Sequence, residues 1–560
     1  MRRSVVLLVA VVAALTGVVL GASVGGPRLF TARPPVEPHG PSAAEASTPR
    51  TAPGSPERSQ VRTAPETGPE GRCAGPGAGV ARDDRPIVVE PVPGLRATVG
   101  DVHPGWWTSP PVEGAQGLLA FYSLAWLLPA AQGAADDGQA QAMARVVDQA
   151  VAFHRDHPDR GRNGEGWDEG TAMRRLQTLN CLYELSRSPR LASAIAVNVA
   201  VQFGARYYGP PRHGVHNHGT LANLAVLRAG VLLDRPAWRR AAVTRLASEA
   251  PSAWTAAGTT KEQSTTYHAI NVRLWEHAAD AVAAASAAPA PARAMRRLTA
   301  DARAVLEWMT EPDGHTVVIG DSQAEPGPRR AAGTARAFRD DDAGLAVGRW
   351  SWRDPSTTYY TLRYGPPRWG HGQQDRGGVT WSTLGARVLV NPGRFSYDIS
   401  PLQAYQAGPR SHNVAIPDGA TLDLRAHVGV SGSRLEEARH DWGMADRLYG
   451  VPHNRHVAVD DAAHTLTVSD RYASSTRFSQ MWHLDPRWTL AHGAPDGTAL
   501  TFRSGPRTLT VTTTGRFAPV VTGSDQPVGG WNFPAPGRRT PNAEIRVTAT
   551  GTATTTFRMD

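Results

Sequence analysis

The sequence predicts a multidomain chain of mixed α and β structure, with a helical N-terminal domain followed by an antiparallel β-sandwich. Three observations support this fold class. Apolar residues recur every three or four positions from about residue 86 to residue 310, which is the period of an amphipathic helix. After about residue 340 the period becomes two, which is typical of strands. The helices all precede the strands, so we expect two domains side by side with a ligand site in the cleft between them.

The helical part is divided by prolines at positions 158, 189, 210, 211, 236, 289 and 291. Nothing strand-like separates the helices, so the sequence predicts helical hairpins stacked in a row or a ring. The expected helices cover residues 115–133, 139–155, 171–186, 190–204, 219–234, 236–249, 264–286 and 290–309.

The strands expected in the second domain are alternating or β-branched runs that are separated by Gly, Pro, Asp and Asn turns. They lie within residues 345–352, 357–365, 378–393, 465–472, 499–505, 507–515 and 544–559.

The N-terminus predicts export. Arg2 and Arg3 precede roughly twenty apolar or small residues, a pattern typical of a secretory signal peptide or a membrane anchor. We therefore expect residues 1–26 to be one of these two. The positive-inside rule keeps the arginines in the cytoplasm and sends the rest of the chain outside, as an extracellular or cell-surface protein.

Residues 27–85 are rich in Pro, Ala, Ser, Thr, Gly and Glu and have few large apolar groups, so they are predicted to form a disordered stalk. The expected domains are then residues 86–325 and 326–560. The chain has two cysteines, Cys73 and Cys181, and the sequence leaves open whether they pair.

The formal net charge of +9 fits an anionic partner such as an acidic polysaccharide or an anionic lipid surface. No basic run resembles a nucleic-acid-binding arm, so no nucleic acid is expected. The sequence also has no Gly-rich phosphate loop, nucleophile elbow or HExxH motif.

Two polar clusters open predicted helices. Residues 216–219 (HNHG) precede the helix expected from Thr220, which either Asn217 or His218 would cap. Residues 261–268 (KEQSTTYH) open another helix, with Ser264 as its expected cap and Tyr267 near the positive end of the helix dipole. Capping alone would explain both clusters without any chemistry.

Two more polar clusters precede strands. Residues 369–378 (WGHGQQDRGG) place glycines on both sides of His371, which lets the backbone turn and present an imidazole at a sheet edge. Residues 410–413 (RSHN) lead into a strand. Each cluster alone would also fit an ordinary polar turn.

Taken in this order, the four clusters resemble the heparinase II/III-like polysaccharide lyases. Residues 216–219 resemble that family's Asn-His-Gly segment, and residues 261–268 its Glu-x-Ser-x-x-Tyr-His segment. Residues 371–398 resemble its His-x-x-x-Asp segment and the following Pro-Gly strand pair, and residues 410–419 its Ser-His-Asn strand. The resemblance covers roughly residues 100–490. It implies an incomplete (α/α) toroid followed by an antiparallel β-sandwich.

The chemistry that the resemblance implies is β-elimination on a uronic acid residue. Neutralising the carboxylate lets charge develop as an enolate when the C5 proton leaves. A base takes that proton and an acid protonates the departing O4. Asn217 would neutralise the carboxylate with help from His218. Tyr267 would be the acid and a candidate base, and His371 the other acid or base. Supporting or substrate-binding roles would belong to His216, Glu262, Arg410 and His412.

The resemblance departs from the family at a structural zinc site. Several members have a second histidine two positions after the first in the segment of His371, and an Asp before the Pro-Gly pair. Here Gln373 and Asn391 occupy these positions, and only His412 remains of that set. Because Gln and Asn are poor zinc ligands, the sequence predicts no zinc, or at most a weakly bound hard cation, and no cofactor.

The leading hypothesis is therefore an exported polysaccharide lyase acting on an acidic, uronate-containing polymer. Two alternatives stay open. One is a catalytically silent polysaccharide-binding protein tethered to the cell envelope, which the anchor-like N-terminus, the stalk and the altered metal positions favour. The other is a glycoside hydrolase on the same scaffold.

Overall fold

The computed structural model describes the chain from Cys73 to Asp560, with gaps. The chain divides into the units Met1–Ser59 and Gln60–Asp560, and every described residue belongs to the second. The signal peptide or anchor predicted at residues 1–26 lies outside the described residues, as does the stalk predicted at residues 27–85 except for Cys73 and Arg85. The described residues are Cys73, residues 85–156 apart from positions 93, 100, 101, 103 and 113, and residues 166–204, 215–286, 289–328 and 333–560.

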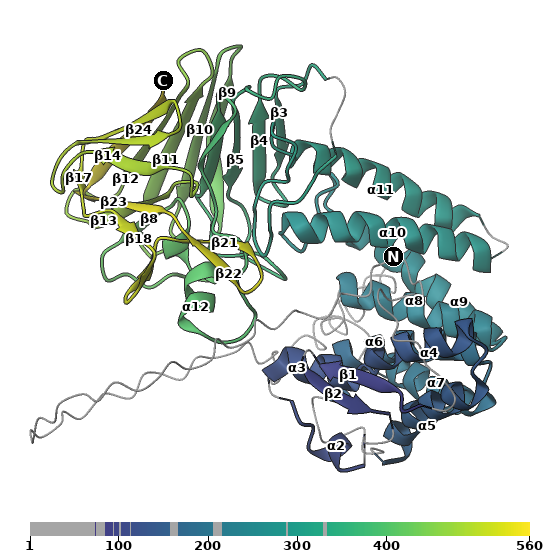
Figure 1. The fold of residues 1–560 in the computed structure, drawn as a ribbon. Coiled ribbons are helices and arrows are strands. Elements are labelled where there is room, and N and C mark those ends of the chain that lie inside the picture. The colour runs from purple at the N-terminus through teal and green to yellow at the C-terminus, as the bar shows by residue number, and fades with distance from the viewer. Residues whose placement is uncertain are drawn as a thin grey trace, which may run out of the picture. The chain divides into compact units, whose positions relative to one another are not determined.

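The N-terminal part of this unit is helical, as predicted (Figure 1). Pro189 and Pro236 stand at helix starts, where the missing N–H costs nothing. The helices are α2 (Pro104–Thr108), α3 (Gly114–Tyr122), η1 (Ala125–Leu127), α4 (Leu128–Asp136), α5 (Ala140–Asp156), α6 (Glu169–Ser186), α7 (Pro189–Phe203), α8 (Asn217–Leu232), α9 (Pro236–Glu249), η2 (Ala250–Ser252), α10 (Thr265–Ala285), α11 (Ala290–Trp308), α12 (Pro401–Ala407) and η3 (Pro409–Ser411).

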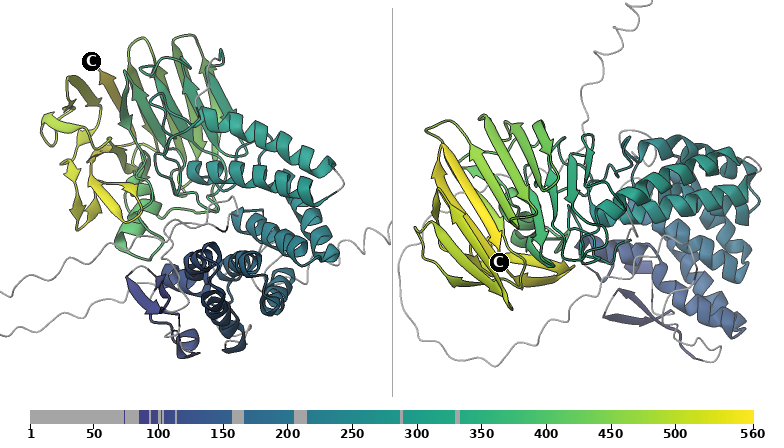
Figure 2. Two further views of the ribbon diagram at one scale, coloured as in Figure 1. Left: turned by 45° about the vertical axis from the view of Figure 1, so that its right-hand side comes forward. Right: turned by 90° about the horizontal axis from the view of Figure 1, so that it is seen from above.

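The long helices pack as successive hairpins. Helix α4 packs on α5, α6 on α7, α8 on α9 and α10 on α11, while α4, α6, α8 and α10 follow one another in a single row. Buried aromatic and aliphatic side chains such as Trp107, Phe153, Leu182 and Trp275 fill the space between them. The N-terminal ends of α6, α8 and α10 lie on one side of this row, because His218 at the start of α8 lies beside Gly170 in the first turn of α6 and Asn217 donates to Glu262 just before α10. Figure 2 shows the stacked helices of the row.

Two details of the helical part differ from the prediction. A β-hairpin, β1 (Val88–Val92) and β2 (Leu95–Thr98), stands where only helices were expected, and Gly94 turns it with φ +87°. The single helix expected over residues 115–133 is broken at Leu124, whose φ of 60° is left-handed. Leu124 is fully buried, so core packing holds a conformation that its side chain disfavours.

Strands from Ala337 onward form antiparallel sheets, as predicted. The larger sheets have the orders β14-β15-β16-β24-β12-β11-β10-β9, β17-β23-β13-β8 and β3-β4-β5-β6-β7. Their strands are β3 (Ala337–Asp340), β4 (Leu345–Arg349), β5 (Tyr359–Arg363), β6 (Val379–Thr383), β7 (Ala386–Leu389), β8 (Ala415–Pro417), β9 (Val428–Leu435), β10 (Arg439–Asp446), β11 (His453–Asp460), β12 (Thr465–Arg471), β13 (Arg477–His483), β14 (Thr489–His492), β15 (Ala499–Ser504), β16 (Arg507–Thr513), β17 (Arg516–Phe517), β23 (Ala543–Thr550) and β24 (Thr552–Met559).

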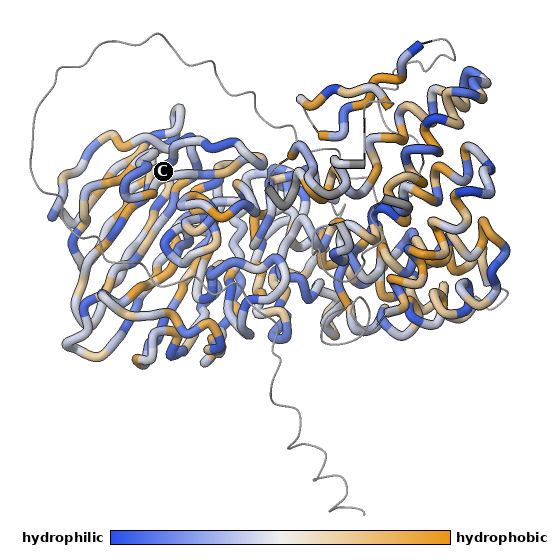
Figure 3. Tube along the Cα trace, turned by 90° about the horizontal axis from the view of Figure 1, so that it is seen from below, coloured by the Kyte–Doolittle hydropathy of each residue, from blue (hydrophilic) through white to orange (hydrophobic). Residues whose placement is uncertain are grey.

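Short strands complete this part. They are β18 (Val521–Thr522), β19 (Ser524–Asp525), β20 (Val528–Gly529), β21 (Trp531–Ala535) and β22 (Arg538–Pro541). A shared core joins the three larger sheets through residues such as Trp381, Trp442 and Trp482. Figure 3 shows hydrophobic residues recurring along both the helices and the strands, which is the pattern that placed these elements.

A buried ionic cluster ties β11 to β12. The Arg455 guanidinium donates to both carboxylate oxygens of Asp470, at 2.7 and 2.8 Å, and His453 lies 2.8 Å from the same carboxylate. Burial opposes ionisation of Asp470, but Arg455 and His453 outweigh it and hold the pKa of this carboxyl below its usual range. Asp470 therefore stays charged inside the sheet core.

Two further findings bear on the N-terminal predictions. Cys73 and Cys181 form a disulfide with their Cα atoms 5.1 Å apart, which answers the question that the sequence left open. Within the described ranges, no helix has the length and apolar character needed to cross a membrane.

Candidate active site

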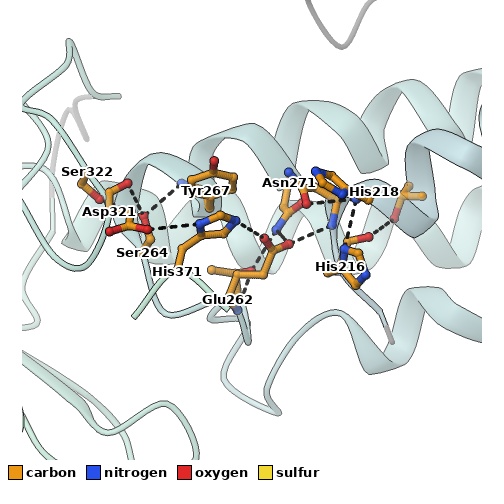
Figure 4. Close-up of polar contacts among 12 residues, drawn as sticks. His216, His218, Glu262, Ser264, Tyr267, Asn271, Asp321, Ser322 and His371 are labelled. Atoms are coloured by element: carbon orange, nitrogen blue, oxygen red, sulfur yellow. Dashed lines mark hydrogen bonds and ion pairs between the residues drawn. The ribbon is translucent and has the colours of Figure 1, made fainter. Parts of the chain in front are cut away.

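Three of the four predicted clusters meet on the side of the helix row where α8 and α10 begin. Glu262 lies between them, beside the backbone of Asn217 at the start of α8 and beside His371 from a loop of the sheet part (Figure 4). The helical part thus supplies Asn217, His218 and Tyr267, and the sheet part supplies His371.

The start of α8 lies earlier than the sequence predicts. The helix begins at Asn217, and its cap is His216, whose Nδ1 accepts from the backbone N–H of His218 at 3.2 Å. Asn217 Oδ1 accepts from the same N–H at 2.9 Å. The prediction that Asn217 or His218 caps a helix starting near Thr220 is therefore wrong. The Nδ2 group of Asn217 has no hydrogen-bond partner among the described residues.

Glu262 is a buried carboxylate that joins the helical groups to His371. Its side chain is 2% exposed, and its Oε1 accepts from the backbone N–H of Asn217 at 2.9 Å and from Asn271 Nδ2 at 2.7 Å. Its Oε2 lies 3.6 Å from Nε2 of His371. Burial raises the pKa of Glu262, and the Asn271 hydrogen bond and His371 oppose that rise.

Tyr267 and His371 form the centre of the site. Their rings stack with centroids 3.3 Å apart and planes 8° from parallel. The predicted cap Ser264 is confirmed, since its hydroxyl accepts from the backbone N–H of Tyr267. Tyr267 is thereby held in the first turn of α10, and the stack holds His371 over it.

His371 is oriented from both of its ring nitrogens. Nδ1 lies 3.3 Å from Asp321 Oδ2 and 3.1 Å from Tyr397 Oη, while Nε2 faces Glu262. The backbone is fixed too, because the N–H of His371 donates to the Glu262 carbonyl at 3.0 Å and its carbonyl accepts from the N–H of Asp321 at 2.8 Å. Gly320 permits this approach, since a Cβ there would come within 2.5 Å of the His371 carbonyl oxygen.

Tyr397 is the main residue that the sequence analysis missed. Its Oη lies 3.0 Å from Tyr267 Oη and 3.1 Å from His371 Nδ1, so it bridges the two stacked rings. Partial burial and the nearby Asp321 carboxylate raise the pKa of Tyr397.

Asn271 and Asp321 were also missed. Asn271 lies four residues after Tyr267 on α10, so helical spacing places both on one face and could have identified it. Asp321 lies in a loop outside the motifs. Tyr397 lies at the end of the segment 371–398, but nothing local in that segment marks its side chain for a role.

The fourth cluster is placed differently from the other three. His412 is fully buried, with its Nδ1 3.2 Å from Asn391 Oδ1, and burial lowers its pKa to about 4. His412 has no exposed surface with which to contact a polysaccharide, so of its two predicted roles only the supporting one stays a prediction. Arg410 is half exposed, and its nearest carboxylate is Glu544 at 3.9 Å.

The positions of the family's zinc ligands are hydrogen-bonded to protein groups. Gln373 Nε2 donates to Asp321 Oδ1 at 2.9 Å, and Asn391 Nδ2 donates to the Val318 carbonyl at 2.9 Å. Throughout the described part of the chain, no three His, Cys, Asp or Glu side chains gather as metal ligands do. These residues do not fit a zinc ion, and no step below uses one.

A Glu262→Gln variant is expected to lower kcat about tenfold or more, because it replaces the carboxylate that faces His371 Nε2 and accepts from the start of α8 with an amide. Its free energy of unfolding should rise relative to that of the original chain between about pH 4 and pH 7. The sign follows from the raised pKa, since a buried carboxylate costs stability only once it ionises. Chemical denaturation at both pH values, with kinetics at pH 7, checks this prediction. The prediction would be contradicted if the free energy of unfolding of the variant, relative to that of the original chain, were lower at pH 7 than at pH 4.

Comparisons with known proteins bear on the family of the sheet part and on the fold. Residues 333–560 match the family model described as Heparinase II/III-like, C-terminal. No significant match was found among the curated proteins.

Two solved structures share the fold. A heparan sulfate lyase HepC mutant from Pedobacter heparinus has a TM-score of 0.63 at 15% identity, covering 84% of this chain and 81% of that one. A structure of Heparinase III has a TM-score of 0.67 at 14% identity, covering 81% and 78%. Residues 333–560 therefore match the heparinase II/III-like C-terminal family, in agreement with the resemblance of the motifs at residues 371–398 and 410–419.

Proposed function

We propose that this chain is an exported polysaccharide lyase that cleaves an acidic, uronate-containing polysaccharide by β-elimination. The observation that carries the proposal is the Tyr267–His371 stack, which Tyr397 bridges and which lies across Glu262 from Asn217. It combines two proton-transfer groups with an amide donor, and these are the groups that this elimination requires.

The reaction moves one proton off the substrate and one onto it. A base removes the C5 proton of the uronate, and the C–H electron pair forms the C4–C5 double bond. The bond from C4 to the glycosidic oxygen breaks, and an acid protonates that oxygen. The products are a new unsaturated end and a free hydroxyl on the departing sugar, so no water, metal or oxidant is consumed.

Asn217 and His218 are the proposed partners of the uronate carboxylate. The Oδ1 atom of Asn217 accepts from the backbone N–H of His218, so Nδ2 is the atom of this amide that would donate to a carboxylate. The N-terminal end of α8 carries a partial positive charge that adds to this effect. A carboxylate held here is neutralised while charge develops next to it.

Tyr267 and His371 are the proposed acid and base. The series Tyr267 Oη, Tyr397 Oη and His371 Nδ1 has spacings of 3.0 and 3.1 Å, which lets a proton pass between the two catalytic rings. Glu262 and Asp321 lie on the two sides of the imidazole, 3.6 Å from Nε2 and 3.3 Å from Nδ1, and hold the orientation of the ring.

A Tyr397→Phe variant is expected to lower kcat about 10- to 100-fold, because the phenol that bridges the two rings is lost while the stack remains. KM should change little, since the ring stays. Steady-state kinetics on the cleaved polymer checks this, with Ser396→Ala as the neighbouring control. An unchanged kcat would remove Tyr397 from the proposal.

Export is part of the proposal. The apolar N-terminal segment supports it, and so does the Cys73–Cys181 disulfide, because disulfides persist in oxidising compartments. Residues 1–26 would direct or anchor the chain, residues 27–85 would space it from the envelope, and the 86–325 and 326–560 domains would act together on the polymer.

The test is direct. The purified chain is incubated with heparan sulfate, hyaluronan, chondroitin, alginate and a glucuronan, and ultraviolet absorbance follows the conjugated double bond. A rise with one polymer that His371→Ala abolishes supports the lyase. Reducing ends without absorbance would indicate the hydrolase instead. Binding to a polymer with no new ends would indicate the silent binding protein.

A further inference from the structure

Trp369 stands apart from the other tryptophans of the chain. All 16 lie in described residues, and Trp369 alone is exposed, with 48% of its surface open to solvent. An exposed indole beside polar catalytic groups is a feature of ligand sites, because burying it on folding would have been favourable. Neither the capping of α8 nor the proton transfers proposed above use it.

The turn that presents Trp369 is rigid. Its backbone N–H donates to Gln263 Oε1 at 3.1 Å, and its carbonyl accepts from the N–H of Gly372 at 3.1 Å. Arg368, the residue before it, is buried and ion-paired with Asp375 at 2.8 Å. Gly370 follows with φ +60°, where a Cβ would press on Glu262 at 3.3 Å. The indole is therefore preorganised, which lowers the entropic cost of binding.

Trp369 also has a defined position along the site. Its ring centroid lies 6.5 Å from that of His216, the cap of α8, with planes at 65°. Tyr397 and Asp321 lie on the Nδ1 side of His371, whereas Glu262 and the start of α8 lie on its Nε2 side. The indole thus belongs to the Nε2 side, beyond the proposed carboxylate partner Asn217.

We propose that Trp369 and His216 form a sugar-binding subsite, in which the indole stacks on the apolar C–H face of the pyranose next to the uronate that reacts. The inference rests on the proposed function and adds a positioning residue to it. One face of a pyranose presents mainly C–H groups, which match an indole in size and polarity. Such a contact depends little on salt, unlike the carboxylate contacts at Asn217.

The test separates this inference from the lyase proposal. Trp369→Ala should raise KM about 5- to 20-fold with kcat within about twofold, at low and at high salt, and Trp369→Phe should recover part of the loss. Leu490→Ala, which truncates an exposed side chain on β14, is the matched control and should change neither constant. An unchanged KM in Trp369→Ala would overturn the subsite while leaving the lyase intact.

If the chain shows no cleavage, the subsite can still be tested by measuring polymer binding alone. Affinity electrophoresis of Tyr267→Phe and Tyr267→Phe/Trp369→Ala, in gels that contain heparan sulfate, hyaluronan, chondroitin or alginate, measures retention by each polymer. Retention that weakens with the Trp369 change supports the subsite even if the original chain cleaves nothing, which would count against the lyase alone. No retention of either variant, together with no cleavage by the original chain, overturns both.

Discussion

A Tyr267→Phe variant is expected to lower kcat by about 100- to 10,000-fold, the range for loss of a positioned proton-transfer group. The phenylalanine ring keeps the stack on His371, so only the hydroxyl and its bond to Tyr397 are removed. KM should stay close to its original value, because the substitution leaves the proposed substrate contacts of Asn217 and Trp369 in place. Initial rates of ultraviolet absorbance increase on the cleaved polymer measure this effect.

Tyr183→Phe is the matched control for this prediction. It removes a phenol hydroxyl near the C-terminal end of α6, away from the helix starts that build the site, and should leave kcat unchanged. Equal unfolding midpoints of the two variants would show that the loss at Tyr267 is chemical. A Tyr267→Phe chain with full activity would contradict the proposed acid and base roles.

An Asp470→Asn variant is expected to lower the free energy of unfolding by about 3–5 kcal/mol, the cost of leaving a buried charge without its counterion. Arg455 is 1% exposed and loses its carboxylate partner, and His453 loses one of its two. Asparagine has nearly the same size, so the loss is electrostatic and leaves no cavity. Urea titration followed by tryptophan fluorescence measures the change.

The control for this prediction is Asp525→Asn, which breaks an ion pair with Arg539 at the surface. Both partners there are more than a third exposed, so we expect a change of about 0–1 kcal/mol. If the two substitutions had equal effects, the Asp470 cluster would be no more important than a surface pair.

The sequence predicts the long elements of this fold well, because their periods are long enough to read. Helices α5 to α11 lie within two residues of their predicted bounds. Strands β9, β10 and β11 were missed because polar side chains interrupt their alternation. On β10, for example, the inward-facing residues are His440, Trp442 and Met444, and His440 is buried against the Tyr360 hydroxyl at 2.9 Å.

The candidate site also contains residues that the sequence predicts and residues that it does not. Asn217, Tyr267 and His371 lie in short motifs, and the structure brings them together around Glu262. Tyr397 is 130 residues from its partner Tyr267, and no local pattern reveals such a contact. His412 lies in a motif but is fully buried, so a motif match alone does not show that a side chain can reach substrate.

The proposed reacting groups come from both sides of residues 328–333 in the sequence. One side contributes Glu262 and Tyr267 and the other contributes His371 and Tyr397, so neither fragment alone has a full set of reacting groups. Turnover would therefore require both fragments to be present and associated. If the chain were split at this point and expressed as two fragments, the appearance of lyase activity would measure their association.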